Sequence, residues 1–161
     1  MPAHVMELPR MVVAGSGILA DTGRLLEDLE VGRKCLVLSG PNVKEAVGSE
    51  LSTALVNAGY RVEWSNVSAA SFSEAERAAS LAKKTDSKFI IGVGGGKSID
   101  VAKLAAFNCK IPFVSIPTSA SHDGISSPFA SVKGLDRPYS IVTKPPIAIF
   151  ADTAIIAKAP F

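Results

Sequence analysis

The sequence has little of what several functional classes require. It contains only two cysteines, Cys35 and Cys109, each inside an apolar segment and neither in a Cys-x-x-Cys pair. This pattern argues against zinc-ribbon and thiol-redox functions, and both cysteines are expected to be buried core thiols. Histidine is equally scarce, with only His4 and His122. Because His4 lies near the N-terminus, His122 is the main candidate for chemistry. A metal site with three protein ligands is therefore hard to build from this chain alone.

Charge and long apolar runs are also scarce. The formal net charge is +2, and the lysines at positions 83, 84 and 88 are not interleaved with aromatic residues. A solvated helix end explains this lysine cluster better than a nucleic-acid-binding surface does. The sequence shows no cationic leader and no apolar run of the roughly 18 residues that a membrane span needs. We therefore expect a cytoplasmic protein that is not embedded in a membrane and does not bind nucleic acid.

What the sequence does have is an alternation of strand and helix signals. Hydrophobic residues make up 47% and charged residues 20% of the 161 positions, which suits one well-packed domain. Strands are predicted at residues 35–38, 60–64, 89–93, 113–116 and 147–151, and a hairpin is predicted from 129–132 and 139–142. Helices are predicted up to about residue 58, from 75 to 81, and from about 98 to 107. This order predicts an α/β fold, with a Rossmann-like parallel sheet and helices on both faces.

Local patterns refine the helices. In the helix that ends near residue 58, apolar residues recur at steps of three and four and are expected on one face: Val43, Ala46, Val47, Leu51, Ala54 and Leu55. Ser73 precedes Glu76 by three residues, which is a capping-box spacing. Asp152 or Thr153 is expected to cap a last short helix, a role that fits Asp152 better than metal binding does.

The strongest chemical signal is the glycine-rich stretch 92–100, which follows a predicted buried strand and opens a helix. Glycines let a ligand approach the backbone closely, and a helix N-terminus favours phosphate. Lys97 adds charge, and Ser98 is expected to donate its hydroxyl and to cap the helix. Asp100 is expected in the first helical turn, where it can accept a hydrogen bond from a ribose or an amide. A glycine turn without a ligand is the alternative, but three successive glycines cost backbone entropy that a plain turn does not need.

Two standard phosphate-binding motifs do not fit this stretch. The Walker pattern needs four residues between its first glycine and Gly-Lys-Ser, whereas Gly92 to Gly96 leaves three. The dinucleotide fingerprint needs a glycine where Lys97 stands, and it belongs in the first strand–helix unit rather than the third. A P-loop-like nucleotide-binding module therefore stays a disfavoured alternative.

A second polar stretch, residues 115–124, follows the next predicted strand. Its hydroxyls, imidazole and carboxylate are expected at the carboxyl ends of parallel strands, where open α/β sheets bind ligands. A Ser-His-Asp hydrolase triad is disfavoured, because triads are assembled from separate segments, whereas Ser121, His122 and Asp123 are consecutive. A polar loop that satisfies its own backbone is the other alternative.

These stretches together resemble a known family. The segments 94–100, 116–118 and 151–156, with Ala159-Pro160, are similar to the iron-alcohol-dehydrogenase and glycerol-dehydrogenase superfamily. The stretch 121–131 resembles, more specifically, the archaeal sn-glycerol-1-phosphate dehydrogenases. The resemblance covers nearly the whole chain and implies the N-terminal, NAD(P)-binding domain of a two-domain, dehydroquinate-synthase-like fold. Family members reduce dihydroxyacetone phosphate to sn-glycerol 1-phosphate, a precursor of archaeal membrane lipids.

The resemblance also implies roles for particular residues. Asp123 is implied to contact the substrate, and no residue of this chain is assigned as catalytic. The implied cofactor-binding residues are Gly94, Gly95, Gly96, Lys97, Ser98, Ile99, Asp100, Thr118, Ser119, Ala120, Ser121 and Ser127.

A zinc ion, held by an aspartate and two histidines of a helical C-terminal domain, is implied to polarise the substrate oxygen. Those ligands are expected outside residues 1–161, so this chain is expected to bind cofactor but not to catalyse by itself. A homo-oligomer is expected at full length. The remaining alternatives within the superfamily are a glycerol dehydrogenase or another metal-dependent alcohol dehydrogenase. Outside it, the alternative is a regulatory or structural domain without a ligand.

The residues after the first predicted strand bear on the choice of cofactor. NAD-restricted enzymes often place an acid there to bind the ribose 2′-hydroxyl, but the stretch Leu38 to Asn42 contains none. A 2′-phosphate would not be repelled, so NADPH is expected to bind at least as well as NADH. Lys44 and Arg61 are the candidate partners for such a phosphate.

Overall fold

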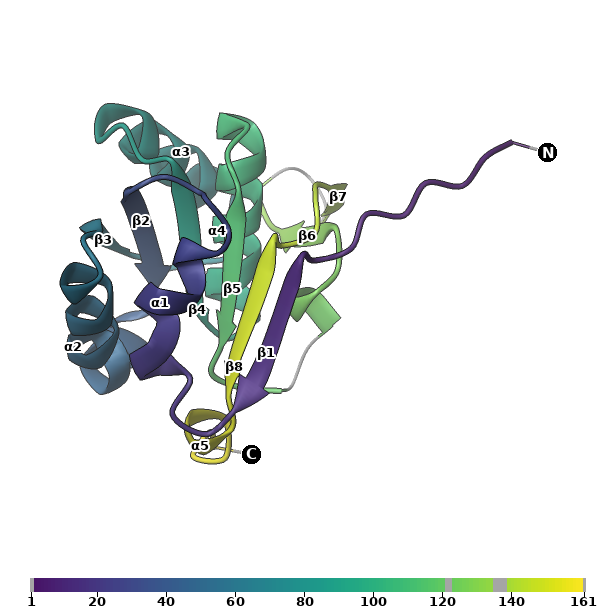
Figure 1. Ribbon diagram of the computed structural model, residues 1–161. Helices are drawn as coiled ribbons and strands as arrows, with labels where there is room; N and C mark the ends of the chain where they lie inside the picture. The colour runs from purple at the N-terminus through teal and green to yellow at the C-terminus, as the bar shows by residue number, and fades with distance from the viewer. Residues whose placement is uncertain (1, 121–122, 135–138, 161) are drawn as a thin grey trace.

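The computed structural model describes residues 2–120, 123–134 and 139–160 and is centred on a parallel sheet (Figure 1). The six strands are β1 (Met11–Gly15), β2 (Lys34–Ser39), β3 (Arg61–Asn66), β4 (Phe89–Gly94), β5 (Phe113–Pro117) and β8 (Ala148–Asp152). Their order is β1-β8-β5-β4-β2-β3, and every neighbouring pair is parallel. The predicted α/β fold with a Rossmann-like parallel sheet is confirmed.

Helices cover both faces of this sheet, as predicted. They are α1 (Thr22–Glu27), α2 (Pro41–Asn57), α3 (Phe72–Lys84), α4 (Gly96–Cys109) and the short α5 (Thr153–Ile156), with 3-10 turns η1 (Leu19–Asp21) and η2 (Asp123–Ile125). Because strand side chains alternate, Val37 packs with α1 and α2, whereas Leu36 and Leu38 pack with α3 and α4. Two apolar clusters, one on each face, therefore form the core.

A two-stranded antiparallel hairpin lies outside the main sheet. Its strands are β6 (Phe129–Val132) and β7 (Tyr139–Val142), as the sequence predicted. Ala130 and Val132 turn inward and are buried in the same apolar cluster as α4. The hairpin thereby brings the chain that follows β5 back against the helix that follows β4.

Three local features differ from the predictions: the N-cap of α3, the exposure of Ala46 and the presence of strand β1. Helix α3 begins at Phe72, and its N-cap is Ser71, whose Oγ accepts the Glu74 N–H at 3.2 Å. The capping position is therefore two residues earlier than the predicted Ser73, because partly buried Phe72 starts the helix against the core. In α2, Ala46 is exposed rather than on the buried face. Strand β1 was not predicted, since an edge strand with alternate exposed positions gives only a weak apolar signal.

Candidate functional site

All six strands are parallel, but the direction in which successive strands are added to the sheet reverses between β2 and β4. Helix α2 carries the chain from β2 outward to β3, whereas α4 carries it from β4 the other way to β5. In open α/β sheets, ligands bind at the carboxyl ends of the strands beside such a reversal. Here both helices start with a glycine N-cap, Gly40 and Gly95, so neither first turn is capped by a side chain. Backbone N–H groups of two helices are therefore available at this edge.

Each glycine after Ile91 meets a different constraint. A Cβ on Gly92 would lie 2.8 Å from the Cβ of Ala102, so this glycine allows α4 to pack on β4. Gly94 has a φ of +136°, which a residue with a side chain rarely adopts. Among the described residues, a Cβ on Gly95 would meet the Ser119 Oγ at an ordinary contact distance of 3.5 Å, and Gly95 has an ordinary φ of −88°. The described part of the fold would thus tolerate a Cβ at Gly95, unlike one at Gly92 or Gly94.

The remaining predicted residues of this stretch lie along the start of α4. Lys97 is exposed, whereas Ser98, Ile99 and Asp100 are buried. Because α4 begins at Gly96, Ser98 lies inside the first turn and is not the predicted N-cap. Asp100 was expected in the first turn, but it is the fifth residue of α4 and lies just beyond that turn. Its carboxylate oxygen is 3.7 Å from the Lys103 Nζ.

The second polar stretch meets the glycine stretch after β5. The Thr118 N–H donates to the Gly94 carbonyl at 3.0 Å, and Ser119 faces Gly95 as described above. Ala120 is exposed and Asp123 is the first residue of η2, whereas Ser121 and His122 lie outside the described residues. The structure thus brings Thr118 and Ser119 to the glycine stretch.

The continuation of this stretch turns back toward the hairpin. Further along, the Ser127 Oγ lies 3.3 Å from both the N–H and the carbonyl oxygen of Phe129. Ser127 therefore stabilises the turn that leads into β6.

Lys103 is the residue that sequence reasoning missed. The sequence placed it within the helix predicted from about 98 to 107 and gave it no role, yet it is 1% exposed. Its Nζ donates to the carbonyl oxygens of Gly124 at 2.6 Å and Phe129 at 2.8 Å. Burial lowers the pKa of Lys103, and the nearby carboxylate of Asp100 opposes that shift. A lysine inside an otherwise apolar helical run was the available signal.

A second group, at the end of β2, was predicted only in part, because Lys44 was named from the sequence but the contacts of Trp64 were not. Ser39 is buried, and its Oγ accepts a hydrogen bond from the indole N–H of Trp64 at 2.9 Å. The Lys44 Nζ lies 5.8 Å from the centre of the Trp64 ring, within reach of a cation–π interaction. Arg61 is at the opposite end of β3, where the strand register sets it beside Lys34 of β2, at the far end of that strand from Ser39. Of the two proposed cationic residues, only Lys44 is therefore near the carboxyl end of β2.

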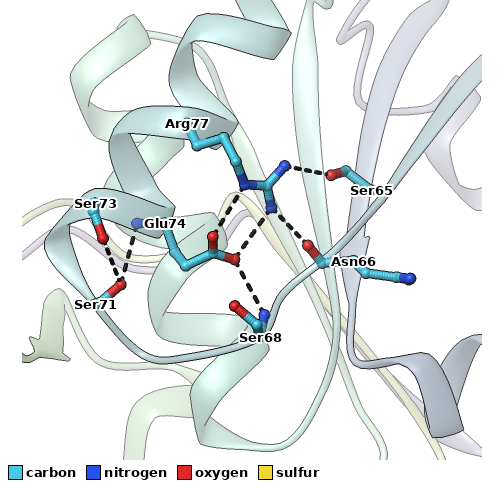
Figure 2. A network of polar contacts seen from close by, with 7 residues as sticks. All are labelled: Ser65, Asn66, Ser68, Ser71, Ser73, Glu74 and Arg77. Carbon is cyan, nitrogen blue, oxygen red and sulfur yellow. Dashed lines mark hydrogen bonds and ion pairs between the residues drawn. The ribbon is translucent and has the colours of Figure 1, made fainter.

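A polar network fixes the turn between β3 and α3 beside this group (Figure 2). The Arg77 guanidinium donates to the Ser65 Oγ at 2.8 Å, to the Asn66 carbonyl at 2.6 Å and to the Glu74 carboxylate at 3.0 Å. The Glu74 carboxylate also accepts the N–H of Ser68 at 3.1 Å. These hydrogen bonds, led by that of Arg77, hold the pKa of Glu74 below its usual value.

The remaining candidates have structural roles. Asp152 caps α5 through the Ala154 N–H and also accepts the Leu19 N–H, each at 3.0 Å, which confirms its predicted capping role. Cys35 is buried, and burial raises its pKa to about 12. Cys109 is only partly buried, and its thiol donates to the Ala79 carbonyl.

The described ranges contain neither a metal-holding cluster nor a membrane-spanning helix. Among those residues, no three His, Cys, Asp or Glu side chains gather closely enough to hold a metal ion. No helix in the same ranges is both long and apolar enough to cross a membrane.

The fold and the glycine stretch define a doubly wound α/β domain, a class that binds ligands where the strand order reverses. The family model for iron-containing alcohol dehydrogenases matches residues 13–160, and the chain belongs to this family. It is 45% identical to the glycerol-1-phosphate dehydrogenase (NAD(P)+) of Metallosphaera sedula over 98% of this chain and 44% of that protein. It is 44% identical to the protein of the same name from Methanothrix thermoacetophila, over 98% of this chain and 45% of the relative. The chain thus spans less than half the length of these relatives.

Solved structures of the superfamily have the same fold. The glycerol dehydrogenase of Schizosaccharomyces pombe superposes with a TM-score of 0.87 at 26% identity, over 99% of this chain and 41% of that one. The NADH-dependent butanol dehydrogenase A of Thermotoga maritima superposes with a TM-score of 0.87 at 20% identity, over 99% and 46%. The second similarity establishes the shared fold alone.

Proposed function

We propose that this chain is the NAD(P)-binding domain of a glycerol-1-phosphate dehydrogenase, which interconverts dihydroxyacetone phosphate and sn-glycerol 1-phosphate. Two relatives that carry this name are 44–45% identical across nearly the whole chain. The observation that carries the proposal is Gly95, between the N-terminus of α4 and Ser119, where the described part of the fold would tolerate a Cβ and so does not itself require a glycine. A phosphate there would meet backbone N–H groups and the positive end of the helix dipole.

The proposed reaction divides the work between cofactor and protein. A bound nicotinamide cofactor supplies the hydride chemistry, and the protein supplies binding and orientation. Gly94 to Gly96 allow the diphosphate to approach the backbone, while exposed Lys97 adds a positive charge at the rim. Thr118 and Ser119 form the opposite wall, and the chain then leads to Asp123, the proposed substrate contact.

NADPH is proposed to bind at least as well as NADH. The end of β2 offers Ser39 and no acid, and Lys44 lies over the Trp64 ring beside it. A carboxylate at this place would repel a 2′-phosphate, whereas an ammonium group attracts it.

Two measurements test the proposal. This chain should quench or enhance NADPH fluorescence on binding, and the full-length protein should oxidise NADPH when given dihydroxyacetone phosphate. Absence of cofactor binding by a folded chain would overturn the proposed cofactor domain. Cofactor binding with turnover of dihydroxyacetone but not of its phosphate would instead favour a glycerol dehydrogenase, the function of the structurally similar protein from Schizosaccharomyces pombe.

The P-loop alternative is disfavoured by the backbone. Strand β4 ends at Gly94 and α4 begins at Gly96, so Gly95 alone connects them. A P-loop wraps several residues around the phosphates of its nucleotide, and a single connecting residue cannot do so. Competition between ATP with magnesium and NADPH would show which nucleotide the edge prefers.

We also propose a cytoplasmic homo-oligomer that binds no nucleic acid. Support for association comes from the N-terminal residues 2–10, which lead away from the domain (Figure 1) and expose Val5, Met6 and Leu8. Strand β1 is also an edge strand with Val12 exposed, a feature that often pairs with another chain. Analytical ultracentrifugation of the full-length protein tests the oligomer.

A further inference from the structure

Lys103 is buried at a position where a lysine is costly. It lies in α4 among residues 98–106, all of which are buried. Removing an ammonium group from water is unfavourable unless hydrogen bonds and opposite charge replace the lost hydration. An apolar residue would pack there at lower cost, so the contacts of the ammonium group should explain its presence.

Those contacts connect two segments that are distant in sequence. The Nζ donates to the carbonyls of Gly124 and Phe129, at 2.6 and 2.8 Å, and lies 3.7 Å from the Asp100 Oδ1. Its three N–H donors thus face two backbone carbonyls and one carboxylate. Asp100 belongs to the proposed cofactor stretch on the same helix, three residues earlier.

The two carbonyls bracket the segment after β5. Gly124 directly follows Asp123 within η2, and Phe129 opens β6. The Phe129 carbonyl also lies 3.3 Å from the hydroxyl of Ser127, which donates to it. One ammonium group therefore anchors both ends of the six-residue segment 124–129 to the helix that begins at the glycine stretch.

We propose that Lys103 is a positioning residue, which fixes the backbone carrying Asp123 and Ser127 relative to the glycine stretch. This inference rests on the proposed function, because Asp123 and Ser127 matter only if substrate and cofactor bind there. Lys103 itself does not touch the reacting atoms in this account. Its effect on the reaction passes through the carbonyls of Gly124 and Phe129.

Kinetics of three variants of the full-length protein provide the first test. Lys103→Met retains most of the length of the side chain but removes the charge and the donors, whereas Lys103→Arg retains both. Leu104→Ala, at a neighbouring buried position of α4, is the control for a weakened core. Lys103→Met should raise KM for dihydroxyacetone phosphate at least tenfold and lower kcat, with a smaller rise in the NADPH Kd, because Gly94 to Gly96 stay in place. Lys103→Arg should recover part of the loss.

The control separates positioning from stability. Leu104→Ala should lower Tm at least as much as Lys103→Met does, yet leave KM near the wild-type value. A Lys103→Met protein with wild-type KM and kcat would overturn the proposal. So would a Leu104→Ala protein with the same kinetic loss, because general weakening of the core would then explain both.

Hydrogen exchange supplies a test that does not depend on the reaction. Amide protons of residues 124–130 should exchange at least tenfold faster in Lys103→Met than in wild type, while those of β2 and β4 stay protected. Unchanged exchange in that segment would overturn the anchoring role and leave the proposed function intact. Faster exchange in Lys103→Met, together with a wild-type protein that does not reduce dihydroxyacetone phosphate, would overturn the function and leave the anchoring role intact.

Discussion

The glycine stretch after β4 and the segment after β5 lie at the same edge of the sheet but are held in place differently. Gly95 alone joins β4 to α4, and the neighbours that constrain Gly92 and Gly94 include Ala102 and Ser98, close by in sequence. The segment 124–129 is instead held by Lys103, which is 21 and 26 residues away from its two acceptors. The first is thus fixed largely by its own residues, and the second by a distant side chain.

Gly95→Val should produce the largest effect on binding, because it fills the space of the glycine stretch without breaking its structure. Gly95 has a φ of −88°, which valine can adopt, and the added Cβ would lie 3.5 Å from the Ser119 Oγ. We expect NADPH affinity to fall about 30-fold or more, roughly 2 kcal/mol, with Tm near that of wild type. Fluorescence titration and thermal melting measure both quantities. Unchanged NADPH affinity in the folded variant would remove the glycine stretch from the cofactor site.

Gly92→Ala, in the same stretch, should lower stability and leave NADPH affinity nearly unchanged. Its Cβ would lie 2.8 Å from the Ala102 Cβ and 3.0 Å from the Phe113 ring, and overpacking of this kind costs about 1–3 kcal/mol. Urea denaturation should show that loss, while the protein that remains folded should bind NADPH within about twofold of wild type. A stable Gly92→Ala protein that fails to bind would show that Gly92, like Gly95, serves the ligand.

The same difference explains what could be predicted from the sequence. The order of strands and helices and the glycine stretch were predictable, because apolar periodicity and runs of glycine are local signals. The exact start of α4 was not, since Ser98 looks like an N-cap, whereas backbone geometry makes Gly95 the cap. Similarly, Ser71 and Ser73 are both plausible caps for α3, and packing of Phe72 selects Ser71.

Contacts between distant residues could not be predicted in this way. Nothing near Lys103 in the sequence indicates that Gly124 and Phe129 accept its hydrogen bonds, because the hairpin must first fold back onto α4. The pairing of Trp64 with Ser39 likewise depends on the register of β2 and β3. That register also decides between the two cationic candidates, since it places Arg61 far from Ser39.

Lys44→Met tests the proposed 2′-phosphate contact at the carboxyl end of β2. Lys44 lies in the first turn of α2 and contacts the Trp64 ring of β3 through its ammonium group, so its loss should leave the segment 124–129 undisturbed. We expect NADPH affinity to fall about fivefold, near 1 kcal/mol, because an exposed ammonium contributes modestly to binding a phosphate. NADH affinity should change by less than about twofold. Equal losses for both cofactors, measured by fluorescence titration, would place Lys44 away from the 2′-phosphate.

Glu74→Gln tests a locally fixed turn that is not expected to touch the ligand, and its effect should be the smallest. The charge-assisted bond to Arg77 is lost, but Arg77 is partly exposed and a Gln can still accept the Ser68 N–H. We therefore expect a loss of about 0.5–1 kcal/mol in unfolding free energy at neutral pH. NADPH affinity should be unchanged.

The pH dependence of that loss follows from the lowered pKa of Glu74 in the folded protein. A carboxyl whose folded pKa lies below its unfolded value, about 4.3 for glutamate, stabilises the fold fully above that unfolded value. The contribution disappears as the pH falls through the folded pKa, because the protonated group no longer pairs with Arg77. The difference in unfolding free energy between wild type and Glu74→Gln should thus be greatest above about pH 5 and shrink in acid. Glu76→Gln, at an exposed position of the same helix, is the matched control. If urea denaturation gives the same difference at pH 3 and pH 7, the Arg77 ion pair does not stabilise this turn.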